Sequence, residues 1–313
     1  MRLGTRGSAL ATTQAHLIGG QLRAAGSNVD IVTVRTEGDV SDRPLTEIGG
    51  TGVFATALRT ALLRREIDIA VHSLKDLPVA NYPGLSIAAI TVREDPRDVV
   101  ITANGQPLHE LGSSARVGTG SPRRAGQLAA LAPAVEVVDI RGNVNTRIAK
   151  LRSGQVEALV LAAAGMARLG RSAEVTQILS PEEMLPAPGQ GALAVECRDP
   201  EYGPASEHAR DRDVRIKTAC AALDDPLTRG CVEAERAMLS ALEAGCTAPV
   251  GALATRSGDE YELTGWVRQA GVSPRIKATG PDPSELGRQV AQKLLRAIAA
   301  HGPEQISKLE CES

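Results

Sequence analysis

The sequence is poor in aromatic side chains and in paired cysteines, and each shortage excludes a class of protein. Of its 313 residues one is Phe, one is Trp and three are Tyr, so the chain lacks the aromatic faces on which single-stranded bases stack. No two of its five cysteines are spaced as C-x-x-C. We therefore expect neither a disulfide framework nor a metal site.

Large net charge and long apolar runs are also missing. The formal net charge is −2, which argues against nucleic acid and membrane surfaces as partners. No run of 18 uncharged apolar residues occurs, and the opening "MRLGTRGSAL" has no continuous apolar segment of the kind found in signal peptides. We expect a soluble, cytoplasmic protein.

Short β-branched or continuously apolar runs alternate with helical patterns through the first two thirds of the chain. Such runs are typical of strands buried on both faces, and the alternation predicts an α/β fold with mostly parallel sheets. The predicted helices span 9–25, 53–65, 122–131 and 144–152. The predicted strands span 29–36, 68–73, 85–92, 98–103, 135–140, 158–164 and 191–197.

Two breaks divide this α/β region. "REDPRD" (93–98) and "LPAPGQG" (185–191) are interpreted as two crossings between two lobes, which would make a cleft with a double hinge. A small α+β domain follows, with a hairpin turning at 257–259 and a last helix capped by Asp282. The predicted domains are 1–92 with 192–217, then 97–187, then 226–313.

The stretch "VGTGSPRRAGQL" (117–128) is the sharpest local signal. A strand ends in Gly-Thr-Gly, Ser121 can cap a helix, and Arg123 and Arg124 fall in its first turn. Basic groups in the first turn are repelled by the positive end of the helix dipole. A bound anion would be attracted both by that dipole and by the two guanidinium groups. The two arginines are therefore either a tolerated misfit or an anion site, and we favour the site.

Further polar residues follow other strand-like runs. Each alone is typical of a solvated surface, but arginines at several strand-to-helix junctions favour a ligand with several carboxylates, because guanidinium matches carboxylate geometry. These residues are Arg6, Ser8, Arg141, Arg147 and Arg168.

"DIAVHSLKDLPV" (68–79) supplies the catalytic candidates. Lys75 and Asp76 follow a buried strand, and a carboxylate beside basic groups in a cleft stays ionised and can take a proton. A surface Lys-Asp turn is the alternative from spacing alone. We expect His72 to be packed in the core.

An ordered set of motifs resembles the hydroxymethylbilane synthase (porphobilinogen deaminase) family from residue 5 to about residue 252. No single string is decisive, but the ordered set is highly specific. The strings are "TRGSALATTQ", "GGTGVF", "DIAVHSLKDLP", "REDPRD", "VGTGSPRRAGQL", "IRGNVNTRIAKL", "LAAAGMARLG", "LPAPGQGALAVEC" and "EAGCTAPVGA".

The resemblance implies two periplasmic-binding-protein-like lobes plus a small C-terminal domain. It also implies an enzyme, a transferase of porphyrin and heme biosynthesis that is expected to be a monomer. Such an enzyme joins four porphobilinogen molecules head to tail with loss of four ammonia, and water then releases linear hydroxymethylbilane. A covalent dipyrromethane cofactor is implied, attached by a thioether to Cys246.

The same resemblance implies the roles of individual residues. Asp76 matches the catalytic aspartate. Cofactor or substrate is expected to face Arg6, Ser8, Phe54, Lys75, Thr119, Ser121, Arg123, Arg124, Arg141, Arg147 and Arg168. Phe54 is equally typical of a core side chain. The sequence departs from the family pattern at Thr51, Gly120 and Pro122, and the stretch 200–228 looks longer than usual.

Two other classes of protein compete with this interpretation. A two-lobed carboxylate-binding protein would normally carry a signal peptide, and a regulator's effector domain would normally follow a helix-turn-helix. Neither requires a cysteine at position 246. An enzyme of this fold that had lost its cofactor would not need both Asp76 and Cys246.

Overall fold

The computed structural model describes residues 1–34, 52–202, 206–243, 248–269 and 271–300. The chain forms two compact units. The first comprises 1–96, 163–173 and 190–229, and the second comprises 97–162, 174–189 and 230–313. Two of the changes between units fall inside the segments interpreted as crossings, 93–98 and 185–191. The three-domain boundaries expected from the sequence remain a prediction.

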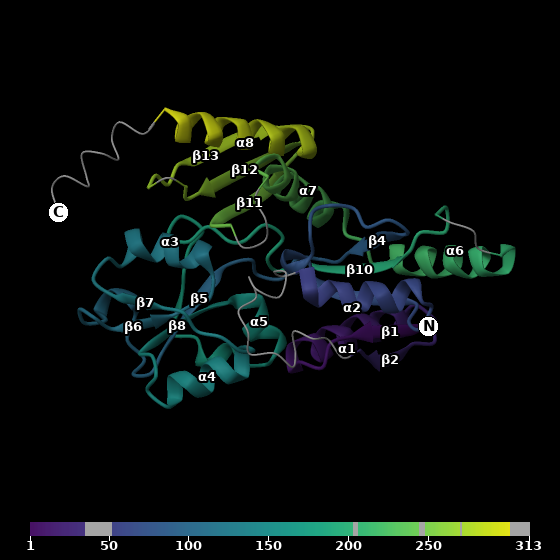
Figure 1. Cartoon of the computed structure of the whole chain (residues 1–313), viewed down its shortest axis with the longest axis horizontal. Coiled ribbons are helices and arrows are strands. Elements are labelled where there is room, and N and C mark those ends of the chain that lie inside the picture. The colour runs from purple at the N-terminus through teal and green to yellow at the C-terminus, as the bar shows by residue number, and fades with distance from the viewer. Residues whose placement is uncertain (35–51, 203–205, 244–247, 270, 301–313) are drawn as a thin grey trace. The chain divides into compact units, whose positions relative to one another are not determined.

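The first unit contains a five-stranded sheet, of which β1, β2, β4 and β10 are labelled in Figure 1. The strand order is β2-β1-β3-β10-β4. Strands β1, β2 and β3 are parallel, and β10 is antiparallel to both β3 and β4. Four strands therefore run one way and β10 runs against them. The bounds are β1 (Arg2–Thr5), β2 (Asp30–Thr33), β3 (Ile69–Ser73), β4 (Leu85–Ile90) and β10 (Leu193–Arg198).

Helices cover both faces of this sheet. Ile69 and Val71 of β3 pack with α1 and α6, whereas Ala70 packs with α2 on the opposite face. This is the alternation expected of a strand buried on two sides. The bounds are α1 (Ala9–Ala24), α2 (Gly52–Leu63) and α6 (Glu207–Ala221), and the short α5 (Ala163–Arg168) contacts α1.

The second unit repeats this topology in the order β7-β6-β8-β5-β9, with β5 as the reversed strand. Leu128 of α3 packs on Val100 and Val160 in its core. The fold class predicted from the sequence is confirmed, because in each of the two five-stranded sheets four strands share one direction. The bounds are β5 (Asp98–Thr102), β6 (Arg116–Gly118), α3 (Pro122–Leu131), β7 (Glu136–Val138), α4 (Val144–Arg152), β8 (Ala158–Ala162) and β9 (Gln177–Ile178).

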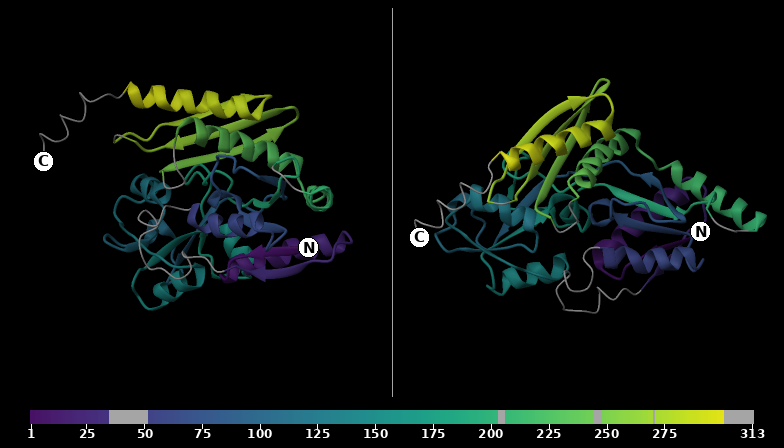
Figure 2. Two further views of the ribbon diagram at one scale, coloured as in Figure 1. Left: turned by 45° about the vertical axis from the view of Figure 1, so that its right-hand side comes forward. Right: turned by 45° about the horizontal axis from the view of Figure 1, so that its top comes forward.

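The C-terminal part is a three-stranded antiparallel sheet, β11-β12-β13, with α8 along one face (Figure 2). Helix α7 approaches α8 at Gly287, where an added Cβ would lie 2.4 Å from the carbonyl oxygen of Ala234. The Asp282 side chain accepts from the Glu285 amide, as the capping pattern predicted. The bounds are α7 (Pro226–Ala241), β11 (Val250–Ser257), β12 (Glu260–Val267), β13 (Arg275–Gly280) and α8 (Pro283–Ala299).

Most of the predicted elements are present. Helices α3 and α4 have the predicted bounds, 122–131 and 144–152. The apolar run 158–164 was interpreted wholly as strand, but the strand ends at Ala162 and α5 begins at Ala163. Strands β9 and β13 were not predicted.

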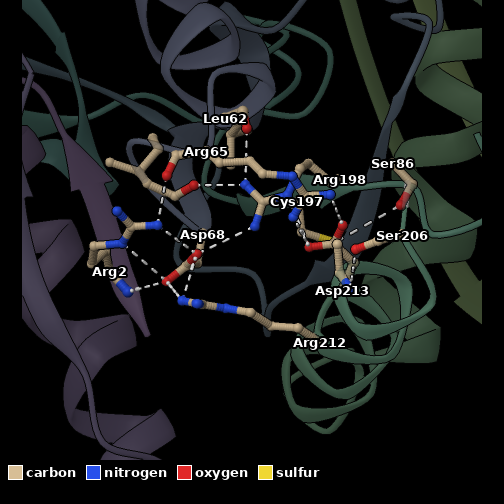
Figure 3. Close-up of polar contacts among 12 residues, drawn as sticks. Arg2, Leu62, Arg65, Asp68, Ser86, Cys197, Arg198, Ser206, Arg212 and Asp213 are labelled. Carbon is tan, nitrogen blue, oxygen red and sulfur yellow. Dashed lines mark hydrogen bonds and ion pairs between the residues drawn. The ribbon is translucent and has the colours of Figure 1, made fainter. Parts of the chain in front are cut away.

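One end of the first sheet carries a network of charges built around two buried carboxylates, Asp68 and Asp213 (Figure 3). Asp68, just before β3, receives ion pairs from Arg2, Arg198 and Arg212 at 3.0–3.2 Å. Asp213 of α6 pairs with Arg198 at 2.9 Å. Burial by itself would raise the pKa of Asp68, but the hydrogen bonds and charge of Arg2, with the charge of Arg212, outweigh it and lower the pKa. The network fastens α6 to the strands.

Within the described residues, no helix combines the length and the apolar character that crossing a membrane requires.

Candidate active site

A pocket of about 90 Å³ lies in the first unit, where β1 and β3 end. Its polar lining includes Arg6, Ser8, Ser73 and Asp76, and its apolar wall includes Leu58 of α2. Ligands of open α/β sheets bind at the carboxyl ends of strands, next to helix N-termini. Three residues singled out in the sequence, Arg6, Ser8 and Asp76, therefore line one hollow.

The turn between β1 and α1 is fixed by its own hydroxyl groups. Ser8 caps α1 by accepting from the Ala11 amide, at 3.3 Å. Thr5 is buried and donates through Oγ1 to the Ala11 carbonyl at 2.9 Å. Arg6 lies between these two anchors, so its backbone is held at the pocket edge.

Asp76 ends a short 3-10 turn, Leu74–Asp76, that directly follows β3. Leu74 is fully buried and its amide donates to the Ala192 carbonyl at 3.0 Å, which fastens the turn to the residue just before β10. The Asp76 side chain is exposed and makes no hydrogen bond or ion pair with the described residues. It is thus a carboxylate that lines a pocket while its oxygens remain available to a ligand.

His72 also lines this pocket, although only 8% of it is exposed. Its Nε2 lies 3.2 Å from Oε2 of Glu196 in β10, and Arg59 of α2 donates to the same carboxylate at 2.8–3.1 Å. Burial alone would raise the pKa of Glu196, but the contacts with His72 and Arg59 lower it. His72 is packed, as expected, and it is also part of the pocket wall.

Lys75 and Arg168 both reach the segment that precedes β10. Lys75 Nζ donates to Gln190 Oε1 at 3.3 Å, and Arg168 Nη2 donates to the Gly191 carbonyl at 2.6 Å. Burial lowers the pKa of Arg168, and the charge of Glu94 opposes this. Gly191 has φ +93°, and an added Cβ would lie 2.2 Å from the Glu94 carbonyl oxygen. Glycine is therefore required there.

In the second unit, four predicted residues gather where α3 begins. Ser121 accepts from the Arg124 amide as the N-cap, and Thr119 Oγ1 accepts from the Ser121 amide at 3.2 Å. Thr119, Arg123 and Arg124 are buried. The cap predicted from "TGSPRR" is confirmed. An added Cβ at Gly120 would lie 3.0 Å from the Ile140 carbonyl oxygen, so this loop lies against the end of β7.

The anion beside Arg123 and Arg124 is a carboxylate of the chain itself. Asp98 of β5 is fully buried and accepts from Arg123 Nη1 at 2.7 Å and from Arg124 Nη2 at 2.8 Å. Burial would raise the pKa of Asp98, but the two arginines outweigh it and lower the pKa. Sequence reasoning missed Asp98, because "REDPRD" was interpreted as a hinge and nothing local links it to a helix 25 residues away.

Arg141 and Arg147 flank the turn into α4. Arg141 is exposed and donates through Nε to Asp139 at 2.9 Å, and Arg147 Nε donates to the Gly142 carbonyl at 2.8 Å. Both side chains lie at the same end of the second sheet as the start of α3, because β6 and β7 are parallel neighbours.

The described residues thus divide the predicted site into two groups. Cys246 and Thr51 lie outside the described residues, and of Phe54 only its backbone in α2 is described. Sequence reasoning also missed Gln14, which lines the pocket and donates to Ser73 Oγ at 3.0 Å. The first unit holds Arg6, Ser8, Lys75, Asp76 and Arg168. The second holds Thr119, Ser121, Arg123, Arg124, Arg141 and Arg147.

Comparison with known proteins identifies the family. Residues 1–203 match the family described as porphobilinogen deaminase, dipyromethane cofactor binding domain, and residues 230–296 match its C-terminal domain. The porphobilinogen deaminase of Acidothermus cellulolyticus is 50% identical over 304 residues, covering 96% of this chain and 89% of the relative. Porphobilinogen deaminase 1 of Streptomyces coelicolor is 49% identical over 318 residues, covering 96% of each.

A more distant likeness is to the periplasmic VFT2 domain of BvgS from Bordetella pertussis, which is 14% identical with a TM-score of 0.39 and covers 71% of this chain and 86% of that one. The family models span both units, and the matched relatives share half of the residues along nearly the whole chain. The chain belongs to the porphobilinogen deaminase family.

Proposed function

We propose that this protein is a hydroxymethylbilane synthase, which joins four porphobilinogen molecules head to tail, releases four ammonia, and frees linear hydroxymethylbilane by hydrolysis. The observation that carries the proposal is family membership at about half identity over 96% of the chain. We further propose that it acts in the cytoplasm as a monomer.

The residues at the start of α3 fit the dipyrromethane cofactor that the family implies. Arg123 is 3% exposed, and its Nε has no hydrogen-bond partner in the described part of the chain. A buried guanidinium N–H without an acceptor is costly, and a carboxylate satisfies it well. The pyrrole rings of a dipyrromethane built from substrate carry acetate and propionate groups, so the residues fit this cofactor.

Thr119, Ser121, Arg123 and Arg124 would hold carboxylates of the cofactor, and Cys246 would carry it. When bound, the cofactor supplies the pyrrole carbon to which the first substrate is joined. Arg6 and Ser8 would bind substrate carboxylates beside Asp76. Guanidinium and carboxylate pair in a planar fork, which orients the substrate as well as holding it.

Asp76 would then act at the reacting pyrrole. Loss of ammonia leaves positive charge on the substrate, and an ionised carboxylate next to it stabilises that charge electrostatically. The same Asp76 oxygens can accept the proton that the pyrrole carbon releases after the new bond forms. The exposed carboxylate in the pocket wall supports this role, because none of the described residues occupies its oxygens.

The intact mass of the purified protein tests the proposal. The mass should exceed that of the sequence by one dipyrromethane, and Cys246→Ala should remove the excess. Incubation with porphobilinogen should release one ammonia per molecule consumed. A wild-type mass equal to the bare chain, together with no ammonia release, would refute the function. Light scattering during gel filtration tests whether the protein is a monomer.

A further inference from the structure

Asp98 distributes its two carboxylate oxygens between the two arginines of α3. Oδ2 accepts from Arg123 Nη1 at 2.7 Å, and Oδ1 accepts from Arg124 Nε at 3.1 Å and Nη2 at 2.8 Å. All three residues are at least 94% buried. Neither guanidinium can turn without losing a charge-assisted hydrogen bond, so the orientation of each depends on this one carboxylate.

Backbone carbonyl groups supply a second anchor for each arginine. Arg123 Nη1 also donates to the Leu185 carbonyl at 2.6 Å, and Arg124 Nη1 donates to the Val160 carbonyl at 3.1 Å. After these bonds, Nε and Nη2 of Arg123 still donate to none of the described residues. The unused donors therefore belong to a guanidinium that is already fixed in place.

The charges of this group do not balance. Two guanidinium groups and one carboxylate leave a net charge of +1 in a buried place, where an uncompensated charge is expensive. Burial lowers the pKa of Arg123, and the charge of Arg124 adds to this effect against that of Asp98. One further negative charge would complete the group, whereas two would overcompensate it.

We propose that Asp98 is a positioning residue for ligand binding. It aligns Arg123 and Arg124 and neutralises one of their two positive charges, so that the two arginines bind a single carboxylate of the ligand. The inference rests on the proposed function, in which a pyrrole ring carries two carboxylates. One carboxylate of a ring is bound by this pair, and the other must be met by different residues.

Asp98→Asn tests the role because it keeps the shape and removes the charge. We expect the fraction of protein carrying the dipyrromethane mass to fall about tenfold or more, since hydrogen bonds to charged groups are lost. For the loaded fraction, KM for porphobilinogen should rise more than kcat falls. A full mass increment with an unchanged KM would overturn the positioning role, even if the melting temperature dropped.

Asp68→Asn is the matched control. Asp68 is equally buried and is also paired with arginines, but it belongs to the charge network of the first unit. This variant should lose melting temperature while keeping the full mass increment. If both variants lost the mass increment, the loss of cofactor would be a general effect of destabilisation, and the inference would be overturned. A wild-type protein without the increment would instead refute the proposed function.

Asp98→Glu keeps the inference testable if the asparagine variant does not fold. It preserves the buried charge and displaces the carboxylate by one methylene. We expect incomplete loading because both guanidinium groups must move. Complete loading with normal KM would show that charge alone suffices and that alignment by Asp98 is unnecessary.

Discussion

Where β1 and β3 end, Arg6 and Asp76 line a pocket, whereas where the same strands begin, Arg2 and Asp68 are joined to each other (Figure 3). The residue types are the same at the two ends. Where the strands begin, each carboxylate oxygen of Asp68 accepts from guanidinium groups, whereas at the pocket the Asp76 oxygens have no such partner among the described residues. The comparison teaches that pairing, not residue type, separates a charge that holds the fold from one available to a ligand.

Asp76→Asn should give the largest effect on the reaction and almost none on the fold. We expect turnover to fall about 10²- to 10⁴-fold, the usual contribution of a proton-transferring group. Because Asp76 is exposed and has no partner among the described residues, the melting temperature of the variant should equal that of the wild-type protein. Steady-state assays and calorimetry measure the two quantities, and unchanged turnover would contradict the assigned role.

Asp68→Asn should give the opposite pattern. Removing the charge leaves Arg198, which is 6% exposed, short of one of its two carboxylate partners. Breaking a buried pair typically costs about 3–5 kcal/mol of unfolding free energy. Urea denaturation measures this loss, and turnover per folded molecule should be retained. A variant as stable as wild type would show that the network contributes no net stability.

Acid should weaken both the charge network around Asp68 and the separate ion pairs of Glu196 with Arg59 and His72. The pKa values of Asp68 and Glu196 are lower in the folded chain than in the unfolded one, where carboxyl groups titrate near pH 4. Their stabilisation is therefore complete above about pH 5 and is lost as the pH falls below 4. Urea midpoints between pH 7 and pH 3 should decline, and less steeply in Asp68→Asn. Equal slopes would contradict the assignment.

Two helix caps, one at the pocket and one beside the charge network, give the smallest expected effects. Ser8 caps α1 at the pocket and Ser206 caps α6 beside the charge network, each accepting an amide at 3.3 Å. Ser8→Ala and Ser206→Ala should each cost about 1 kcal/mol of unfolding free energy. KM should rise in Ser8→Ala alone. If it rises equally in both, the role of Ser8 is capping only.

Local signals were sufficient to predict many of the elements. Ser121 followed by Pro122 fixed the start of α3, because capping and the restricted φ of proline act within a few residues. The end of β8 was missed because Ala162 and Ala163 are equally apolar, and no cap separates strand from helix there. Strand β13 alternates exposed and half-buried residues. It was not predicted because its polar side chains hide the alternation of apolar and polar residues that marks a strand.

The candidate site was predictable where its residues directly follow strands. Arg6 and Asp76 were found because strand-end positions of parallel sheets share one edge. Asp98 and Glu196 were not, because each acts on partners far along the chain, Asp98 on α3 and Glu196 on Arg59, 137 residues away. Such pairings depend on topology, which a single sequence does not display locally.

The antiparallel strands β10 and β5 determine the order in which the two five-stranded sheets can be completed during synthesis. Strand β10 lies between β3 and β4, yet it is made about a hundred residues after them. The nascent first sheet therefore has a gap between β3 and the edge strand β4 until residue 198 has left the ribosome. The second sheet, whose reversed strand β5 is made first, is complete at residue 178 and can close earlier.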